Sequence, residues 1–174
     1  MKNAPLVFLL ICTLFFQYGC ALFPSRESTP IEWPSDISHV QAIAQVNIAW
    51  NNMRYSGDMS LKLDYPDSLF VEVYGPFGDT VLSIQKTPES FLLRSGSDVY
   101  RDEAQFARQF HMTVDDFMDD LAMKGSVQSD TNGNLFTQRN GYRVVYSLLN
   151  NQNRMCWLSS EGTMCIHFLE AVFQ

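Results

Sequence analysis

The stretch "DMSLKLDYPDSLFVEVY", residues 58–74, decides the fold class. Its apolar residues Met59, Leu61 and Leu63 alternate with polar ones, which is the period of a strand that buries one face in an antiparallel sheet. The sequence "YPDS" then predicts a turn, and "LFVEVY" predicts a second strand that is apolar on almost both faces. The stretch therefore predicts two neighbouring antiparallel strands.

The same pattern extends in both directions along the chain. Residues 46–50 alternate in the same way, and Asn51 and Asn52 can then turn the chain, because asparagine tolerates left-handed backbone conformations. The sequence "RNGY" at 139–142 is a strong hairpin signal. Further strands are predicted at 80–86, 90–95, 127–131, 134–139, 142–149, 154–159 and 163–170.

Three segments have helical periodicity instead. Ser35 can cap a short helix that contains Ile37, Val40, Ile43 and Ala44. Residues 102–110 predict a second helix. Thr113 can cap a third, which Gly125 ends and whose apolar stripe consists of Val114, Phe117, Met118 and Leu121. We therefore expect a mainly β protein of the α+β class: a strongly curved, unclosed antiparallel sheet with an N-terminal helix and two short helices over its concave side.

The N-terminal segment predicts export. A weakly basic start is followed by the apolar run Leu6–Phe16, which is too short to span a bilayer, and then by Gly19 and Cys20. This order is typical of a bacterial lipoprotein, with a signal peptide at 1–19, a lipidated Cys20, a flexible tether at 20–34 and one domain at 35–174. Because Ala21 rather than aspartate follows Cys20, we expect an outer-membrane anchor facing the periplasm. The alternative is a secreted soluble protein with a chance cysteine.

Composition and motifs exclude several classes of function. The chain carries 19 acidic and 12 basic residues, a formal charge of −7, which argues against binding to nucleic acid. The run "DDFMDD" at 115–120 is similar to a magnesium-diphosphate motif, but we favour a solvated helix face for its aspartates. The sequence lacks a HExxH motif, a GxSxG elbow and a glycine-rich phosphate loop. We therefore expect no enzyme activity, no cofactor and no metal.

Two cysteines near the end of the chain predict a disulfide. If Ser160 and Glu161 form the turn of the last hairpin, Cys156 lies directly opposite Cys165. An oxidising periplasm would favour a bond between them. The alternative is a pair of buried free thiols.

The stretch "YGPFGDT" at 74–80 places an aromatic residue in a turn. Gly75 and Pro76 predict a tight turn that Gly78 closes, so Phe77 is held outward, where it can contact lipid. The alternative is that Phe77 folds back onto the edge of the sheet.

Three segments, "GPFGDTVLSI" (75–84), "FHMTVDDFMDDLAMKG" (110–125) and "RNGYRVVYS" (139–147), follow one another with a characteristic spacing. They resemble the outer-membrane lipoprotein receptors of the LolB family, within the LolA/LolB-like superfamily. The chain departs from that family in lacking a tryptophan shortly before Gly125 and in having the Cys156 and Cys165 pair. The resemblance implies a half-barrel whose helices form a lid over an apolar cavity for the acyl chains of other lipoproteins.

The resemblance also implies partners and site residues. A periplasmic LolA-like carrier would deliver the cargo, the loop Pro76, Phe77 and Gly78 would insert into outer-membrane lipid, and the protein would be a monomer. Alternation along the strands and helices gives the cavity candidates Leu61, Leu63, Val71, Val73, Leu82, Ile84, Phe117, Leu121, Val144 and Tyr146.

Two other classes of function stay open. One is a structural or partner-binding envelope lipoprotein with the same fold and a filled interior. The other, ranked far lower, is an enzyme that processes acyl chains. An apolar pocket of several hundred cubic ångströms would favour ligand binding, whereas a solid core would count against it.

Overall fold

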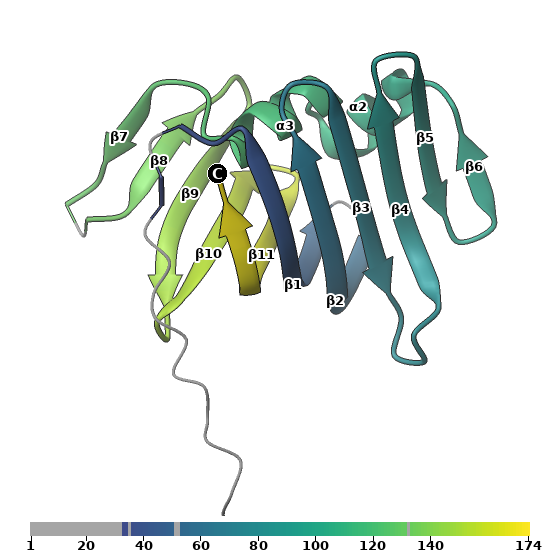
Figure 1. Cartoon of the computed structure of the whole chain (residues 1–174), viewed down its shortest axis with the longest axis horizontal. Helices are drawn as coiled ribbons and strands as arrows, with labels where there is room; N and C mark the ends of the chain where they lie inside the picture. Colours follow the sequence, from purple (N-terminus) through teal and green to yellow (C-terminus); the bar gives the residue numbers. More distant parts are fainter. Residues whose placement is uncertain (1–32, 35, 51–52, 132) are drawn as a thin grey trace, which may run out of the picture.

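Eleven antiparallel strands form one sheet in the computed structural model, which describes residues 33–174 except 35, 51, 52 and 132 (Figure 1). The strands are β1 (His39–Trp50), β2 (Met53–Asp64), β3 (Ser68–Tyr74), β4 (Thr80–Thr87), β5 (Ser90–Ser95), β6 (Asp98–Tyr100), β7 (Val127–Ser129), β8 (Leu135–Gln138), β9 (Tyr142–Leu149), β10 (Gln152–Ser159) and β11 (Gly162–Phe173). Their order is β6-β5-β4-β3-β2-β1-β11-β10-β9-β8-β7, so β6 and β7 are free edges and the sheet does not close. The expected mainly β architecture is confirmed.

The sheet consists of two meanders that join at its centre. Strands β1 to β6 and strands β7 to β11 each follow the chain order, and β1 pairs with β11 between them. The pairing runs from Val40 opposite Phe173 to Trp50 opposite Gly162. The longest strands therefore lie in the middle of the sheet, and the edges are short.

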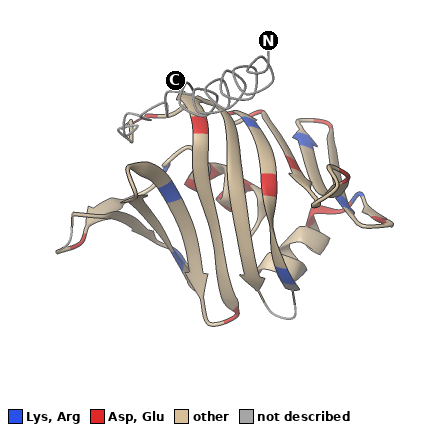
Figure 2. Cartoon of the chain, turned by 90° about the horizontal axis from the view of Figure 1, so that it is seen from below, with Lys and Arg blue, Asp and Glu red and all other residues tan. Residues whose placement is uncertain are grey.

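Two helices lie together against one face of the curved sheet (Figures 1 and 2). They are α2 (Glu103–Phe110) and α3 (Val114–Leu121), and we call the pair the helical layer. Asp102 caps α2 by accepting a hydrogen bond from the backbone N–H of Ala104. Thr113 and Asp116 form a capping box at the start of α3, as the sequence predicts for Thr113. Gly125 lies four residues beyond the last residue of α3.

The hydrophobic core lies between the sheet and the helical layer. Along β1 the residues alternate strictly between exposed and buried from Val40 to Trp50, so one face of the sheet is apolar and the other meets solvent. The helices bury Phe106, Phe110 and Phe117 against that apolar face. The ring of Phe117 lies 5.1 Å from that of Trp157 on β10, measured between centroids, which joins the two layers.

One expectation about the N-terminal part of the domain is corrected. Val40, Ile43 and Ala44, which the sequence analysis placed in a helix, lie in β1, so the helical interpretation of these residues was wrong. Their apparent 3.6-residue spacing is part of a strict period of two, with Ile43 on the exposed face. The proposed helix start at Ser35 lies outside the described residues.

Other predicted features lie outside the described residues as well. They are the signal peptide at 1–19, the lipidated Cys20, most of the tether and the turn at Asn51 and Asn52. Trp33, which we assigned to the tether, packs edge-on against Tyr146 and Phe168 of the domain. Within the described part of the chain, no helix is long and apolar enough to cross a membrane.

Candidate functional site

The ten predicted cavity residues lie on the inner side of the protein, but they pack against one another. Nine of them are buried in the hydrophobic core, and Leu82 is half-buried against it. The nine are Leu61, Leu63, Val71, Val73, Ile84, Phe117, Leu121, Val144 and Tyr146. In this conformation their side chains form the core itself.

Methionines make up part of the core contributed by α3 and by the segments that flank it. Met112, Met118 and Met123 are all buried there. Because the methionine side chain is unbranched and adopts several shapes, it can repack around a different neighbour at low cost. This part of the core is therefore suited to accepting an apolar guest if the helices move.

The four aspartates of "DDFMDD" hold the helical layer in place. The prediction of a solvated face was wrong for Asp120, whose side chain is fully buried. Asp115 and Asp119 each bind a residue outside the helical layer, and Asp116 completes the capping box. Among the described residues, no group of three or more His, Cys, Asp and Glu side chains could hold a metal ion. The motif is thus a set of contacts within the protein.

Asp120 is the centre of a buried polar cluster. Its Oδ1 accepts a hydrogen bond from Nε of Arg139 at 2.9 Å, and Nη2 of the same guanidinium lies 2.9 Å from Oδ1 in an ion pair. Its Oδ2 accepts from the Tyr142 hydroxyl and from Trp157 Nε1, each at 3.0 Å, and its backbone carbonyl accepts from the Tyr146 hydroxyl at 2.9 Å. Strands β9 and β10 and the β8–β9 turn therefore all hold α3 through one residue.

The electrostatics of this cluster follow from its burial. Burial raises the pKa of the Asp120 carboxyl above its ordinary value, while Arg139, Trp157 and Tyr142 oppose the shift. Burial and the nearby Asp120 raise the pKa of the Tyr142 and Tyr146 hydroxyls, so both stay protonated donors. Because the carboxylate and guanidinium depend on each other inside the protein, removal of either would leave the other poorly satisfied.

Lys86 of β4 holds the opposite end of the helical layer. Its Nζ lies 2.8 Å from Glu103 of α2 and 2.9 Å from Asp115 of α3, and only 14% of its side chain is exposed. Burial lowers the pKa of Lys86, but the hydrogen bonds and charges of the two carboxylates outweigh it, and the net shift is upward. One ammonium group thus connects both helices to the sheet.

A third contact comes from the β2–β3 turn. The Tyr65 hydroxyl donates a hydrogen bond to Asp119 at 2.9 Å, and this bond raises the pKa of Tyr65. The helical layer is therefore fastened at β4, at the β2–β3 turn and at strands β9 and β10. These polar contacts surround the apolar residues that it covers.

The turn between β3 and β4 presents Phe77 to solvent. The Phe77 side chain is 96% exposed, more than any other large apolar residue among those described. The backbone N–H of Gly75 donates to the carbonyl of Asp79 at 2.7 Å, and that of Gly78 donates to Gly75 at 2.9 Å. Gly78 has φ = 82°, a left-handed conformation that glycine adopts without cost. Phe77 does not fold back onto the sheet edge.

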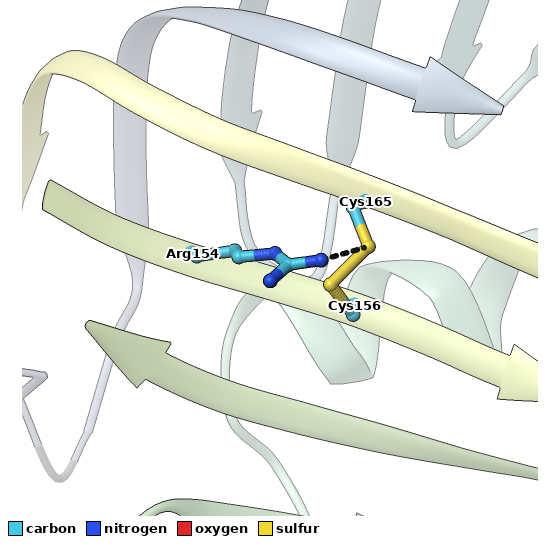
Figure 3. The surroundings of a disulfide bond; sticks show 3 residues. All are labelled: Arg154, Cys156 and Cys165. Atoms are coloured by element: carbon cyan, nitrogen blue, oxygen red, sulfur yellow. Dashed lines mark hydrogen bonds between the residues drawn. A yellow bond between two sulfur atoms is a disulfide. The ribbon is translucent and has the colours of Figure 1, made fainter. Parts of the chain in front are cut away.

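A disulfide joins Cys156 of β10 to Cys165 of β11 (Figure 3). The two cysteines are directly opposite each other in the register that the sequence predicts. They point to the outer face of the sheet, away from the helices, because their neighbours Met155 and Trp157 face the core. The bond fixes the last hairpin next to the central β1–β11 pair.

Sequence reasoning missed Asp120, Arg139 and Lys86 as residues that hold the helices. In α3, Asp120 lies at the border of the apolar stripe, so helical periodicity alone does not decide whether it is exposed. The sequence does show three hydrogen-bond donors, Arg139, Tyr142 and Trp157, on segments predicted to lie side by side. It does not show that their common acceptor is Asp120, because that pairing depends on the folded structure.

Comparisons with known proteins do not place the chain in a family, since neither a family model nor a curated protein sequence matches it.

Proposed function

We propose that this protein is a lipid-anchored half-barrel of the outer membrane that binds the acyl chains of other lipoproteins and helps to insert them into the membrane. The helical layer acts as its lid, and the buried apolar face beneath the lid is the acyl-chain site. The LolB-like spacing of the sequence motifs supports this proposal, as does the unclosed sheet with helices on one face. A periplasmic LolA-like carrier would supply the cargo.

The observation that carries the proposal is the exposed Phe77. A large aromatic side chain that is 96% exposed on a hydrogen-bonded turn buries almost none of its surface against the described residues. Burial of a phenylalanine side chain in an apolar phase contributes about 1.5–3 kcal/mol. That is enough for transient contact with a bilayer and too little to anchor a domain, as a delivery step requires.

The structure represents the closed state of this proposed cycle. With the helical layer fastened, the protein's own side chains fill the site. Acyl chains would enter when the layer moves away, and the buried methionines of α3 and its flanking segments would repack around them. Cargo then moves to whichever site buries its chains better, so no nucleotide is needed.

One observation favours a second candidate function. All but one of the predicted cavity residues are fully buried, which is what a structural or partner-binding envelope protein with a filled interior would show. The two functions differ in whether the interior ever accepts a ligand. A fluorescent fatty acid, titrated into the purified full chain, separates them: saturable binding supports the acyl-chain function. An interior that stays closed to the probe supports the second candidate.

The delivery step is tested in cells. Depletion of the protein should cause other lipoproteins to accumulate in the periplasm or the inner membrane, as shown by membrane fractionation. Phe77→Glu should reproduce this defect while fatty-acid binding in vitro is retained. Leu148→Glu is the matched control, since Leu148 is an apolar residue that is 54% exposed elsewhere on the surface. Equal delivery by the wild type and Phe77→Glu would refute the loop's role.

A further inference from the structure

The outer face of the sheet, opposite the helical layer, has a depression of about 570 Å³ at the β1–β2 and β10–β11 end. Its walls include Arg54, Arg154, His167, Asn47, Ser56 and Thr163. None of the described residues that line it is acidic, although the chain as a whole has a formal charge of −7. The depression is thus a locally basic region, rich in hydrogen-bond donors, on an acidic protein.

Arg154 lines this depression, and no carboxylate of the described residues forms an ion pair with it. Its Nη2 donates to Sγ of Cys165 at 3.2 Å, so the guanidinium points toward the disulfide (Figure 3). Sulfur is a weak acceptor, and Arg154 Nε is buried with no hydrogen-bond partner among the described residues. Buried polar groups are normally satisfied, and a guanidinium is best satisfied by a bidentate anion. The guanidinium group therefore keeps donor capacity that no described residue uses and that an anion in the depression can take up.

Strand pairing places the other donors around Arg154. His167 is the residue directly opposite Arg154 on β11, and Asn47 is opposite Cys165 on β1. Ser56 in turn pairs with Asn47 on β2. Because neighbouring strands lie about 5 Å apart, these side chains form a continuous strip across four strands. The disulfide stiffens the hairpin that carries Arg154.

We propose that this depression, the outer-face anion site, binds a phosphate group, either that of a phospholipid headgroup or free phosphate. Arg154 and Arg54 supply charge, and Asn47, Ser56 and Thr163 supply neutral donors. A tetrahedral phosphate presents its acceptor oxygens in more directions than a planar carboxylate, which suits donors on several walls. The site is separate from the acyl-chain region, which lies on the other face of the sheet.

The position of the site suggests one source of the phosphate group. Tyr55, which lines the depression, donates a hydrogen bond from its hydroxyl to the carbonyl of Tyr74. Tyr74 is the last residue of β3, directly before the turn that presents Phe77. A phospholipid headgroup could therefore be held at the site while Phe77 contacts the apolar part of the same membrane. Free phosphate is the other source, and it requires no membrane.

The test uses the purified full chain in a nonionic detergent, with the ring signals of its three histidines followed by NMR. Inorganic phosphate and a short-chain phosphatidylglycerol are titrated separately at constant ionic strength. We expect the signal of His167 to shift saturably while those of His39 and His111 stay in place. Tighter binding of phosphatidylglycerol identifies a headgroup as the ligand, and tighter binding of phosphate identifies the free anion; both support the site.

Variants test the assigned residues. Arg154→Gln should weaken binding about tenfold or more, because it removes a charged hydrogen-bond donor. Arg54→Gln, on the exposed wall, should also weaken binding and carries less risk to the fold. Arg94→Gln is the matched control, since Arg94 is exposed on β5 and the change in net charge is the same.

Three results would overturn the site: shifts that do not saturate, equal shifts of all three histidines, or an equal loss in the Arg94 control. Phe77→Ser should leave phosphate affinity unchanged, so failure of the anion site and failure of the delivery function can be told apart. If the chain binds fatty acid but does not bind phosphate, only the anion site is refuted. If it binds phosphate but does not bind fatty acid, only the acyl-chain function is refuted.

Discussion

Removal of the Asp120 carboxylate should destabilise the protein far more than removal of its neighbour on the same helix. Asp120→Ala leaves the guanidinium of Arg139, the Tyr142 hydroxyl and Trp157 Nε1 without their acceptor. Breaking a buried ion pair by deleting one partner costs about 3–5 kcal/mol. Since 1 kcal/mol shifts the melting temperature of a domain of this size by about 2–4 °C, we expect a loss on the order of 6–20 °C.

The neighbouring residue provides the matched control. The Asp119 side chain is 34% exposed, and it accepts a hydrogen bond from Tyr65. Asp119→Ala should therefore cost only about 0–1 kcal/mol, as expected for a half-exposed contact. Urea unfolding, followed by circular dichroism and tryptophan fluorescence, measures both variants. If Asp120→Ala were no less stable than Asp119→Ala, the buried cluster would not hold α3.

Hydrogen exchange shows whether the loss is local. If the Asp120 cluster fastens the helical layer, amides of α3 should exchange faster in Asp120→Ala, while those of β1 and β11 keep their protection under native conditions. The same variant should bind the fluorescent fatty acid faster if the layer is a lid. Uniform loss of protection across the sheet would show that Asp120 stabilises the whole domain and not the lid alone.

Three other predictions concern the sheet. Replacing both Cys156 and Cys165 by alanine should lower the free energy of unfolding by about 2–3 kcal/mol in urea titrations, because the bond closes a short loop; an unchanged value would mean that the bond does not constrain the unfolded chain. Burial and Arg154 lower the pKa of His167 below its ordinary value of 6.5, so the unfolded chain binds more protons just below that pH. Stability should therefore fall as the pH drops below about 6.5, and His167→Gln should flatten that part of the pH profile; identical profiles would contradict this reasoning. Gly162→Ala should cost about 1–3 kcal/mol or more, since a Cβ there would lie 2.7 Å from Cα of Trp50, whereas Gly96→Ala meets no atom within 4 Å and should cost less.

Much of the fold could be predicted because its signals are local. The sequence patterns located at least part of every observed strand except β6, which is too short at three residues to show a period. Thr113 and the hairpin at 139–142 were identified from turn and cap chemistry that depends only on neighbouring residues. The helical interpretation of Val40, Ile43 and Ala44 failed because a short apolar segment can match two periods at once.

The site was less predictable because it depends on contacts between distant segments. Turn chemistry together with the family resemblance favoured the outward position of Phe77, and spacing gave the register that places Cys156 opposite Cys165. The role of Asp120 depends on contacts with Arg139 and with residues of β9 and β10. No local sequence pattern predicts contacts between segments so far apart in the chain. Whether the inner residues surround a cavity or fill a core is likewise decided by the curvature of the whole sheet.

The pairing of β1 with β11 at the centre of the sheet has a consequence for biosynthesis. During translation, β1 and β2 emerge long before β11, so β1 keeps an unpaired hydrogen-bonding edge, with Ile43 and Val46 on its two faces, until β11 has been made. Contacts between segments so far apart in sequence form slowly. Changes that delay or weaken β11 should therefore cause aggregation of newly made chains rather than partly folded, partly active protein.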